Sequence, residues 1–172
     1  MEQLINVIES CFKQNDWPYE RFEEDETALQ FEISGKNAYF KGYVYTEESL
    51  RHVVILIFVP NLIPENKRIA VAEYFNRANY GLSVGNFELD MDDGEARYRV
   101  AVDIEGGEMS TTMVENMVGM GFVLTDRYYP GIMALLYSDA TPAEAIAAVE
   151  GSADVEEDEE EEEEDEDEGE KE

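Results

Sequence analysis

An acidic run at the end of the sequence limits folding to the part before it. Residues 154–172 contain sixteen carboxylates and one lysine, a net charge of −16 + 1 = −15, which is half of the total of −30. Such a run repels itself and has almost no apolar side chains to bury. The sequence therefore predicts a disordered acidic tail over residues 151–172, and one folded domain before it.

The charge balance bears on the kind of partner. A protein that binds nucleic acid displaces counterions with clustered Lys and Arg side chains, and an anionic membrane surface attracts the same side chains. The densest basic pair is Lys67-Arg68, and 12 basic residues stand against 42 acidic ones. We therefore expect neither nucleic acid nor a membrane as the partner.

Features near the start and middle of the chain favour a cytoplasmic protein. Cys11 is the single cysteine, which excludes an internal disulfide, and its apolar helical neighbours predict a buried thiol. The first ten residues lack the charged-then-apolar pattern of a signal peptide. The longest apolar run, residues 53–59, is too short to span a bilayer as a helix.

Helical and strand-like patterns alternate through the first half of the chain. Apolar residues at three- and four-residue spacing predict a helix over residues 2–14. Three strands are expected after it, over residues 28–34, 38–46 and 51–59. The last is apolar at nearly every position, which predicts a central strand covered on both sides or partly buried in a subunit interface.

The second half continues the alternation. A helix is expected over residues 64–80, with Gly81 as its left-handed cap. Two strands over residues 86–91 and 96–104 flank Asp92-Asp93-Gly94, which favours a tight hairpin. In that hairpin Arg97 and Arg99 would face Glu88 and Asp90.

Helices close the predicted domain. Ser110 can cap a third helix that Gly121 interrupts, and a further helical stretch over residues 122–137 would be kinked or broken at Pro130-Gly131. A short Ala-rich helix is expected over residues 141–150. The order α-β-β-β-α-β-β-α predicts an α+β fold, with a mainly antiparallel sheet and helices packed against it.

The chain has few candidates for metal binding or catalysis. Asp90, Asp92 and Asp93 fail the EF-hand pattern, because Gly94 falls on the fifth position and Ala101 on the twelfth, so a plain turn is favoured over weak cation contact. The only histidine, His52, favours a structural role over acid–base chemistry and rules out the usual Cys/His zinc site.

Other catalytic patterns are missing. The segment from Gly81 to Gly85 lacks the lysine and the spacing of a phosphate loop. Ser110 has no neighbouring base, so capping is the better explanation of its place. We expect no catalytic residue, no metal and no cofactor.

Two groups of residues are candidates for binding a partner. Met113, Met117 and Met120 recur on one helical stripe, which is either core or an adaptable surface for partner peptides, because methionine repacks easily. Tyr128 and Tyr129 fit an interface and a core equally well. These five residues form the candidate partner-binding set.

Longer stretches resemble a known family. Residues 75–107, FNRANYGLSVGNFELDMDDGEARYRVAVDIEGG, are similar to the central signature of YbjN-domain proteins: an Asn-rich helix end, a glycine, a strand, an Asp-Gly hairpin and an Arg-bearing strand. Residues 126–137, DRYYPGIMALLY, resemble the close of the domain in cyanobacterial-type members. The resemblance covers residues 1–137, and we place the domain at residues 1–140.

The resemblance implies a type III secretion chaperone-like fold that binds partner proteins, commonly as a homodimer, with no established catalytic residues. Some relatives carry the label of sensory transduction regulators. The expected function is therefore a non-enzymatic protein-binding module, chaperone-like or a regulatory adaptor. One alternative is a decoy or docking protein that attracts basic partners through its acidic tail. The other is an enzyme that uses Asp90, Asp92 and Asp93.

Overall fold

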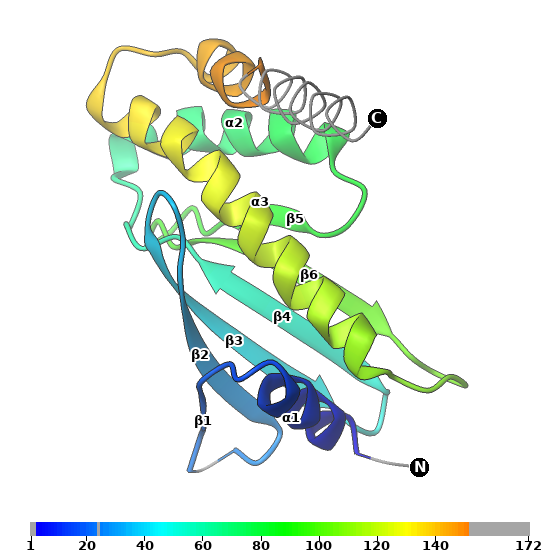
Figure 1. The fold of residues 1–172 in the computed structure, drawn as a ribbon. Coiled ribbons are helices and arrows are strands. Elements are labelled where there is room, and N and C mark those ends of the chain that lie inside the picture. Colours follow the sequence, from blue (N-terminus) through cyan, green and yellow to red (C-terminus); the bar gives the residue numbers. More distant parts are fainter. Residues whose placement is uncertain (1–2, 24, 152–172) are drawn as a thin grey trace, which may run out of the picture.

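The computed structural model describes residues 3–23 and 25–151, and its centre is a six-stranded sheet (Figure 1). The strand order is β1-β2-β3-β4-β6-β5, and each pair of neighbours is antiparallel. The strands are β1 (Tyr19–Arg21), β2 (Ala28–Ser34), β3 (Tyr39–Glu47), β4 (His52–Phe58), β5 (Asn86–Leu89) and β6 (Ala96–Asp103).

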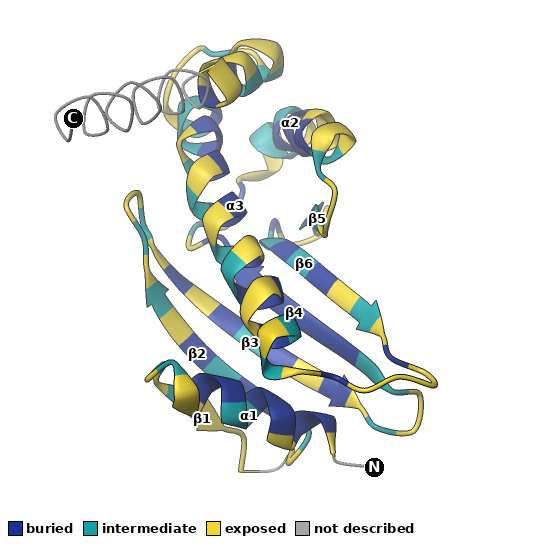
Figure 2. Ribbon diagram, turned by 45° about the vertical axis from the view of Figure 1, so that its right-hand side comes forward, coloured by how far each residue is buried: buried dark blue, intermediate teal, exposed yellow. Residues whose placement is uncertain are grey.

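The helices lie on one side of this sheet. They are α1 (Leu4–Gln14), α2 (Arg68–Gly81), which follows the short 3-10 helix η1 (Glu65–Lys67), and α3 (Thr111–Tyr137). Residues 142–151 are also helical. α1 and α3 cover the sheet, whereas α2 packs beside β5 and against α3 (Figures 1 and 2). Among the described residues, no helix covers the other face of the sheet, and none is long and apolar enough to cross a membrane.

The core forms where β4 meets the helices. Val53, Ile55 and Ile57 of β4 point to the helix side of the sheet, and each is at most 1% exposed. They belong to the same buried core as apolar side chains of α3, among them Val114 and Val118. Burying each such side chain contributes roughly 1.5–3 kcal/mol, so this layer is the main attachment of the helices to the sheet.

A buried tyrosine joins α2 to α3. The side chain of Tyr74 is fully buried, and its hydroxyl donates a hydrogen bond to the Tyr128 carbonyl at 2.9 Å. Burial raises the pKa of Tyr74 far above its ordinary value, since the phenolate would lose its hydration. The ring lies against the backbone of Gly131 on α3. A residue larger than glycine at position 131 would push the Tyr74 ring away.

The α+β fold with an antiparallel sheet is confirmed, but β1 was missed. Its sequence, Tyr-Glu-Arg, is short and polar. β1 exists because it pairs with β2, with Tyr19 opposite Phe31 and Arg21 opposite Leu29. Local sequence carries little of that information, since strand propensity depends on neighbouring strands.

The predicted interruption at Gly121 and break at Pro130-Gly131 are wrong, because α3 is one helix of 27 residues. The alternative of a kink at Pro130-Gly131 stays a prediction. Pro130 cannot donate to the Asp126 carbonyl. The Asn37 side chain donates to that carbonyl instead, at 3.0 Å, and so satisfies it. At Gly121 the helix approaches the sheet closely: an added Cβ would lie 3.3 Å from Ile57.

Of the other local predictions, two are confirmed and one is wrong. Ser110 caps α3 as expected, by accepting the Met113 amide at 3.2 Å. Gly94 has the positive φ of 86° expected of the hairpin turn. Gly81 is not a left-handed cap, since it is the last residue of α2 and an extended Leu82 follows it. The predicted tail, from residue 152 on, lies outside the described residues.

Two glycines of α3 give a matched test of this packing. Gly131→Ala places a methyl group inside van der Waals contact with the buried Tyr74 ring, and such overpacking costs about 1–3 kcal/mol. Gly119→Ala meets nothing within 4 Å, so the helix preference of alanine should stabilise the protein by up to about 1 kcal/mol. Chemical unfolding measures both changes. An equal or greater free energy of unfolding for Gly131→Ala than for Gly119→Ala would contradict the packing described.

Candidate protein-binding surfaces

The helix-free face of the sheet has an apolar centre. Val54 and Leu56 of β4 point to this face, yet they are only 6% and 8% exposed. Their cover comes from neighbouring strands: Tyr45 stands opposite Val54, and Tyr43 and Arg99 flank Leu56. Both faces of β4 are therefore covered as predicted, one by helices and the other by side chains of the neighbouring strands. The alternative, burial of this strand in a subunit interface, stays a prediction.

An aromatic row crosses the helix-free face. Phe22 stacks on Tyr43 with ring centroids 5.7 Å apart, and Tyr43 meets Phe58 edge-on at 5.2 Å. Phe22 and Tyr45 are 37% and 40% exposed. Partly exposed aromatic rings on the face of a sheet are typical of the centre of a protein contact.

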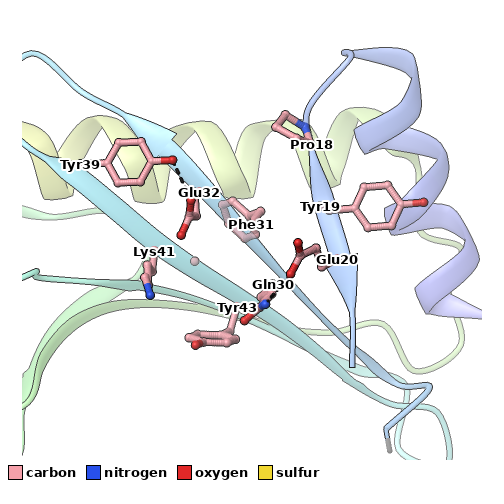
Figure 3. A pocket seen from close by; sticks show the side chains of 10 residues that line it. Pro18, Tyr19, Glu20, Gln30, Phe31, Glu32, Tyr39, Lys41 and Tyr43 are labelled. Carbon is pink, nitrogen blue, oxygen red and sulfur yellow. Dashed lines mark hydrogen bonds between the residues drawn. The ribbon is translucent and has the colours of Figure 1, made fainter. Parts of the chain in front are cut away.

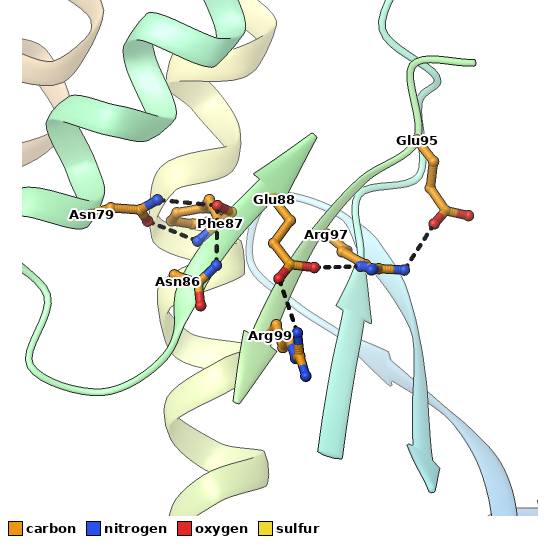
Figure 4. Close-up of polar contacts among 7 residues, drawn as sticks. All are labelled: Asn79, Asn86, Phe87, Glu88, Glu95, Arg97 and Arg99. Atoms are coloured by element: carbon orange, nitrogen blue, oxygen red, sulfur yellow. Dashed lines mark hydrogen bonds and ion pairs between the residues drawn. The ribbon is translucent and has the colours of Figure 1, made fainter. Parts of the chain in front are cut away.

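Charges flank the aromatic row symmetrically. Across the strands the residues in register are Glu32, Lys41, Phe58, Arg97 and Glu88. Arg97 donates to Glu88 at 2.8 Å and to Glu95 at 3.3 Å, and Arg99 donates to the other Glu88 oxygen at 3.5 Å (Figure 4). The predicted pairing of Arg97 with Glu88 is confirmed. Arg99 does not meet Asp90, whose carboxylate accepts the Asp92 amide instead.

A shallow hollow of about 300 Å³ opens on the β1–β3 part of this face (Figure 3). Its polar groups bond to one another: Tyr39 donates to Glu32 at 2.7 Å, and Gln30 donates to Glu20 at 2.8 Å. The bond to Glu32 raises the pKa of Tyr39 above its ordinary value. Because these carboxylates already accept bonds, the hollow presents a paired polar surface rather than converging catalytic groups.

The three candidate methionines meet in a second hollow, on the helix side of the sheet. Met117 is 8% exposed, Met113 is half-buried, and Met120 is 42% exposed. With residues of β6 and the loop before β5 they line a space of about 320 Å³, which we call the methionine hollow. Its lining residues are Val84, Val100, Ala101, Val102, Met113, Asn116, Met117 and Met120.

The two candidate tyrosines lie away from the methionine hollow. Tyr128 is 4% exposed, and its hydroxyl donates to Glu150 at 3.1 Å, which ties α3 to the helical residues 142–151. The Tyr129 hydroxyl donates to Asn61 at 2.7 Å, and its ring packs against Phe40. Both side chains make internal contacts, so we keep only the methionines in the proposed site.

The three aspartates of the acidic hairpin do not share a hollow, because only Asp90 lines one, of about 270 Å³. Asp90, Asp92 and Asp93 are exposed on the turn, where Asp90 and Asp93 accept nearby backbone amides at 2.8 Å. His52 pairs with Asp103 at 3.6 Å at the exposed end of β4. Within residues 3–23 and 25–151, no group of His, Cys, Asp or Glu side chains could hold a metal ion. Cys11 is buried as predicted, and burial together with the charge of Glu115 raises its pKa.

Sequence reasoning found the methionines but missed the helix-free face. Which residues share a face follows from strand register, and the register of β4 with β6 joins residues about 45 positions apart. The alternation of Tyr39, Lys41, Tyr43 and Tyr45 was a usable signal, because side chains two apart share a face. It did not indicate which face the helices would cover.

The ion pairs of the helix-free face predict a pH dependence. Burial alone raises the pKa of Glu88, but the Arg97 hydrogen bond and charge outweigh burial and hold the pKa below its ordinary value. The ionised Glu88 therefore stabilises the folded protein above pH about 4.3, the pKa of a glutamate in the unfolded chain. This stabilisation is lost as the pH falls through the lower pKa that Glu88 has in the folded protein. We expect Glu88→Gln to lower the free energy of unfolding by up to about 1 kcal/mol at neutral pH, and progressively less in acid.

A double-mutant cycle with Arg97→Gln gives the control for that series. In the Arg97→Gln background, Glu88→Gln should lose most of its effect, because the main partner is gone. Urea unfolding of the four proteins across the acid range measures the coupling. A coupling energy that does not change with pH would rule out this origin of the stability.

Comparison with known proteins places the fold in a family. The family model YbjN, described as "Putative bacterial sensory transduction regulator", matches residues 4–133. No curated protein matches the chain. A chain from the HopA1–SchA chaperone–effector complex aligns with a TM-score of 0.45 and 12% identity, over 73% of this chain and 91% of that one. A chain from the ExsC–ExsE complex aligns with a TM-score of 0.48 and 7% identity, over 75% and 96%. The family match spans the sheet, all three named helices up to Met133, and both candidate surfaces, so the chain belongs to the YbjN family.

Proposed function

We propose that this chain is a non-enzymatic protein-binding module that forms a homodimer and holds a segment of another protein, as a chaperone-like or regulatory adaptor. The methionine hollow is the observation that carries the binding part. It combines a partly exposed Met120 and Val84, both 42% exposed, with the flank of an open strand. Methionine side chains adapt to different apolar partners at little cost, which suits a surface that holds polypeptide segments.

The chemistry of this hollow favours a polypeptide over a small metabolite. Asn116 supplies the only polar side chain among its lining residues. Small-molecule sites use converging polar groups to fix a ligand's orientation, whereas an extended segment is oriented by its backbone. The hollow therefore fits apolar side chains that project from a longer chain.

The helix-free face fits the second part of the proposal, a homodimer. On this face three cations, Lys41, Arg97 and Arg99, offset three carboxylates, Glu20, Glu32 and Glu88. Three further carboxylates, Glu47, Glu95 and Asp103, lie toward its margins. In a protein of net charge −30, a face with three cations and exposed tyrosine rings is a place where two copies can meet with less local repulsion than elsewhere. A second copy is therefore the occupant that we assign to this face.

Light scattering tests the dimer. We expect Tyr45→Glu to raise the dimer dissociation constant at least about tenfold, because it puts a charge into the contact. Raising salt from about 0.05 to 0.5 M should tighten the dimer of the unchanged protein, since salt screens the repulsion between two acidic bodies. Tyr80→Glu is the control, because Tyr80 is 95% exposed on α2. A strictly monomeric protein, or equal weakening by both variants, would count against the dimer.

The binding of a basic unfolded protein can show whether the methionine hollow or the acidic tail is the binding element. With reduced and alkylated lysozyme as a labelled probe, the double change Met113→Ser and Met120→Ser should weaken binding at least about fivefold, because apolar contact area is lost. Val123→Ser is the control, since Val123 is 56% exposed on the same helix outside the hollow. Fluorescence anisotropy at about 0.15 M salt measures the affinity.

The decoy alternative makes the opposite prediction for the same probe. If the tail alone attracts the probe, ending the chain after Gly151 removes fifteen net negative charges and abolishes binding, while the methionine changes have no effect. On our proposal the shortened chain binds within about threefold of the full chain at this salt concentration.

A further inference from the structure

Strand β6 has an open edge beside the methionine hollow. β6 pairs with β4 from Arg97 to Asp103, but β5 begins at Asn86, opposite Arg99. Within the described part of the chain, residues 100–103 of β6 therefore have a strand on one side only. Figure 2 shows this lower part of β6 at the margin of the sheet, with α3 on its helix side.

The chain before β5 is built to leave this edge. Gly85 has a φ of 73°, and an added Cβ would lie 2.7 Å from the Arg99 carbonyl oxygen, so glycine is needed for this turn. The Tyr98 hydroxyl donates to the Val84 carbonyl and holds the loop in place. The pairing of β5 with β6 ends there because the backbone turns away.

The hydrogen-bond pattern gives the direction of the groups on the open edge. The Val59 amide donates to Ala96 at 2.9 Å, and the Ile104 amide donates to Arg51 at 3.0 Å. Because antiparallel strands alternate, the even-numbered residues of β6 bond to β4 and the odd-numbered ones point away from it. The N–H and C=O groups of Ala101 and Asp103 therefore face the open edge.

The neighbouring edge is closed by contrast. The backbone groups of Phe87 and Leu89 point away from β6. The Phe87 amide donates to the Asn79 side chain at 2.7 Å, and the Phe87 carbonyl accepts from it at 3.0 Å (Figure 4). Asn79 thus takes the place of a further strand. The edge of β5 at Phe87 is thus closed by a side chain, whereas residues 100–103 of β6 stay open beside an apolar hollow. This difference indicates that the open segment of β6 receives a strand from elsewhere.

Side-chain alternation defines the segment that would fit. In a strand added to β6, residues opposite Val100 and Val102 point to the helix side, into the methionine hollow. The residues between them point to the helix-free side, where Asp103 is exposed. Glu105, two residues after Asp103, is also exposed, and the chain carries a net charge of −30. Apolar residues at every second position, with basic residues between them, match these surroundings.

We infer that residues 100–103 of β6 bind an extended segment of another protein, with alternating apolar and basic side chains, as an added strand antiparallel to β6. The antiparallel direction follows from the rest of the sheet, in which each pair of neighbours is antiparallel. The inference rests on the proposed function and names the binding mode and the partner chemistry of the methionine hollow.

A short peptide tests the inference with the full chain. The probe is a labelled, end-blocked Lys-Val-Lys-Val-Lys-Val-Lys, and Lys-Lys-Val-Val-Val-Lys-Lys is its control of equal composition. We expect the first to bind at least about tenfold more tightly and to slow hydrogen exchange at the Ala101 and Asp103 amides. Binding should weaken as salt rises, unlike the proposed dimer.

Backbone variants isolate the strand pairing. Ala101→Pro removes an amide that β4 does not use, so the β4 ladder stays intact, and peptide affinity should fall at least about tenfold. Val123→Ser is the control, since Val123 is 56% exposed on α3 outside the hollow, and this variant should bind within about twofold. On the peptide side, N-methylation of the lysines should abolish binding and N-methylation of the valines should not, because residues opposite Ala101 and Asp103 bond to β6. Circular dichroism checks that each protein variant is folded.

Several outcomes would overturn strand addition. These are equal binding of the two peptides, unchanged exchange at Ala101 and Asp103, or the reverse effect of the two N-methylations. Slow exchange at both amides without peptide, in a dimer, would assign the edge to a second copy and also overturn the inference. If the peptide fails while unfolded lysozyme still binds through the methionines, only the strand mode is wrong. If both probes fail, the proposed protein-binding function fails as well.

Discussion

Strand β4 is central to the structure because its two faces have different cover. Its odd-numbered side chains are buried under α1 and α3, and this burial holds the helices on one side of the sheet. Its even-numbered side chains, Val54 and Leu56, are covered only by the tyrosines and the arginine of neighbouring strands. A domain of this size buries enough apolar surface with one covered face. The second apolar face is therefore surface that the fold itself does not require.

The long helix α3 connects this core to both ends of the molecule. Its first half packs on β4 and β6 and supplies the methionines, and its second half meets α2 through Tyr74 and Gly131. Asn37, from the β2–β3 turn, satisfies the carbonyl that Pro130 leaves open, while the Asp126 carboxylate accepts amides of that turn. The continuity of α3 thus depends on contacts with a hairpin about ninety residues earlier.

This dependence on distant contacts explains which parts of the fold could be predicted from the sequence. Periodicity identified α1, β2, β3 and the β5–β6 hairpin, because their side chains alternate between core and solvent at the spacing of the element. An unbroken apolar run identified β4, which is buried on both faces. The unbroken α3 and the strand β1 were not predictable in this way, since both exist only through partners distant in sequence. The methionines were recognised as a stripe. Their meeting with an open strand edge could not be recognised, because the edge arises from the turn at Gly85 and the register of β5 with β6.

The high negative charge is consistent with two apolar surfaces on one small protein. Exposed apolar surface promotes indiscriminate association, and a net charge far from zero opposes it by repelling most other acidic proteins and other copies at long range. Contact then requires a partner that offsets the charge. The helix-free face offsets it locally, through Lys41, Arg97 and Arg99, whereas the edge of β6 retains exposed carboxylates. The same overall charge therefore selects different partners at the two surfaces: the cation-bearing face of a second copy at one, and a basic segment at the other.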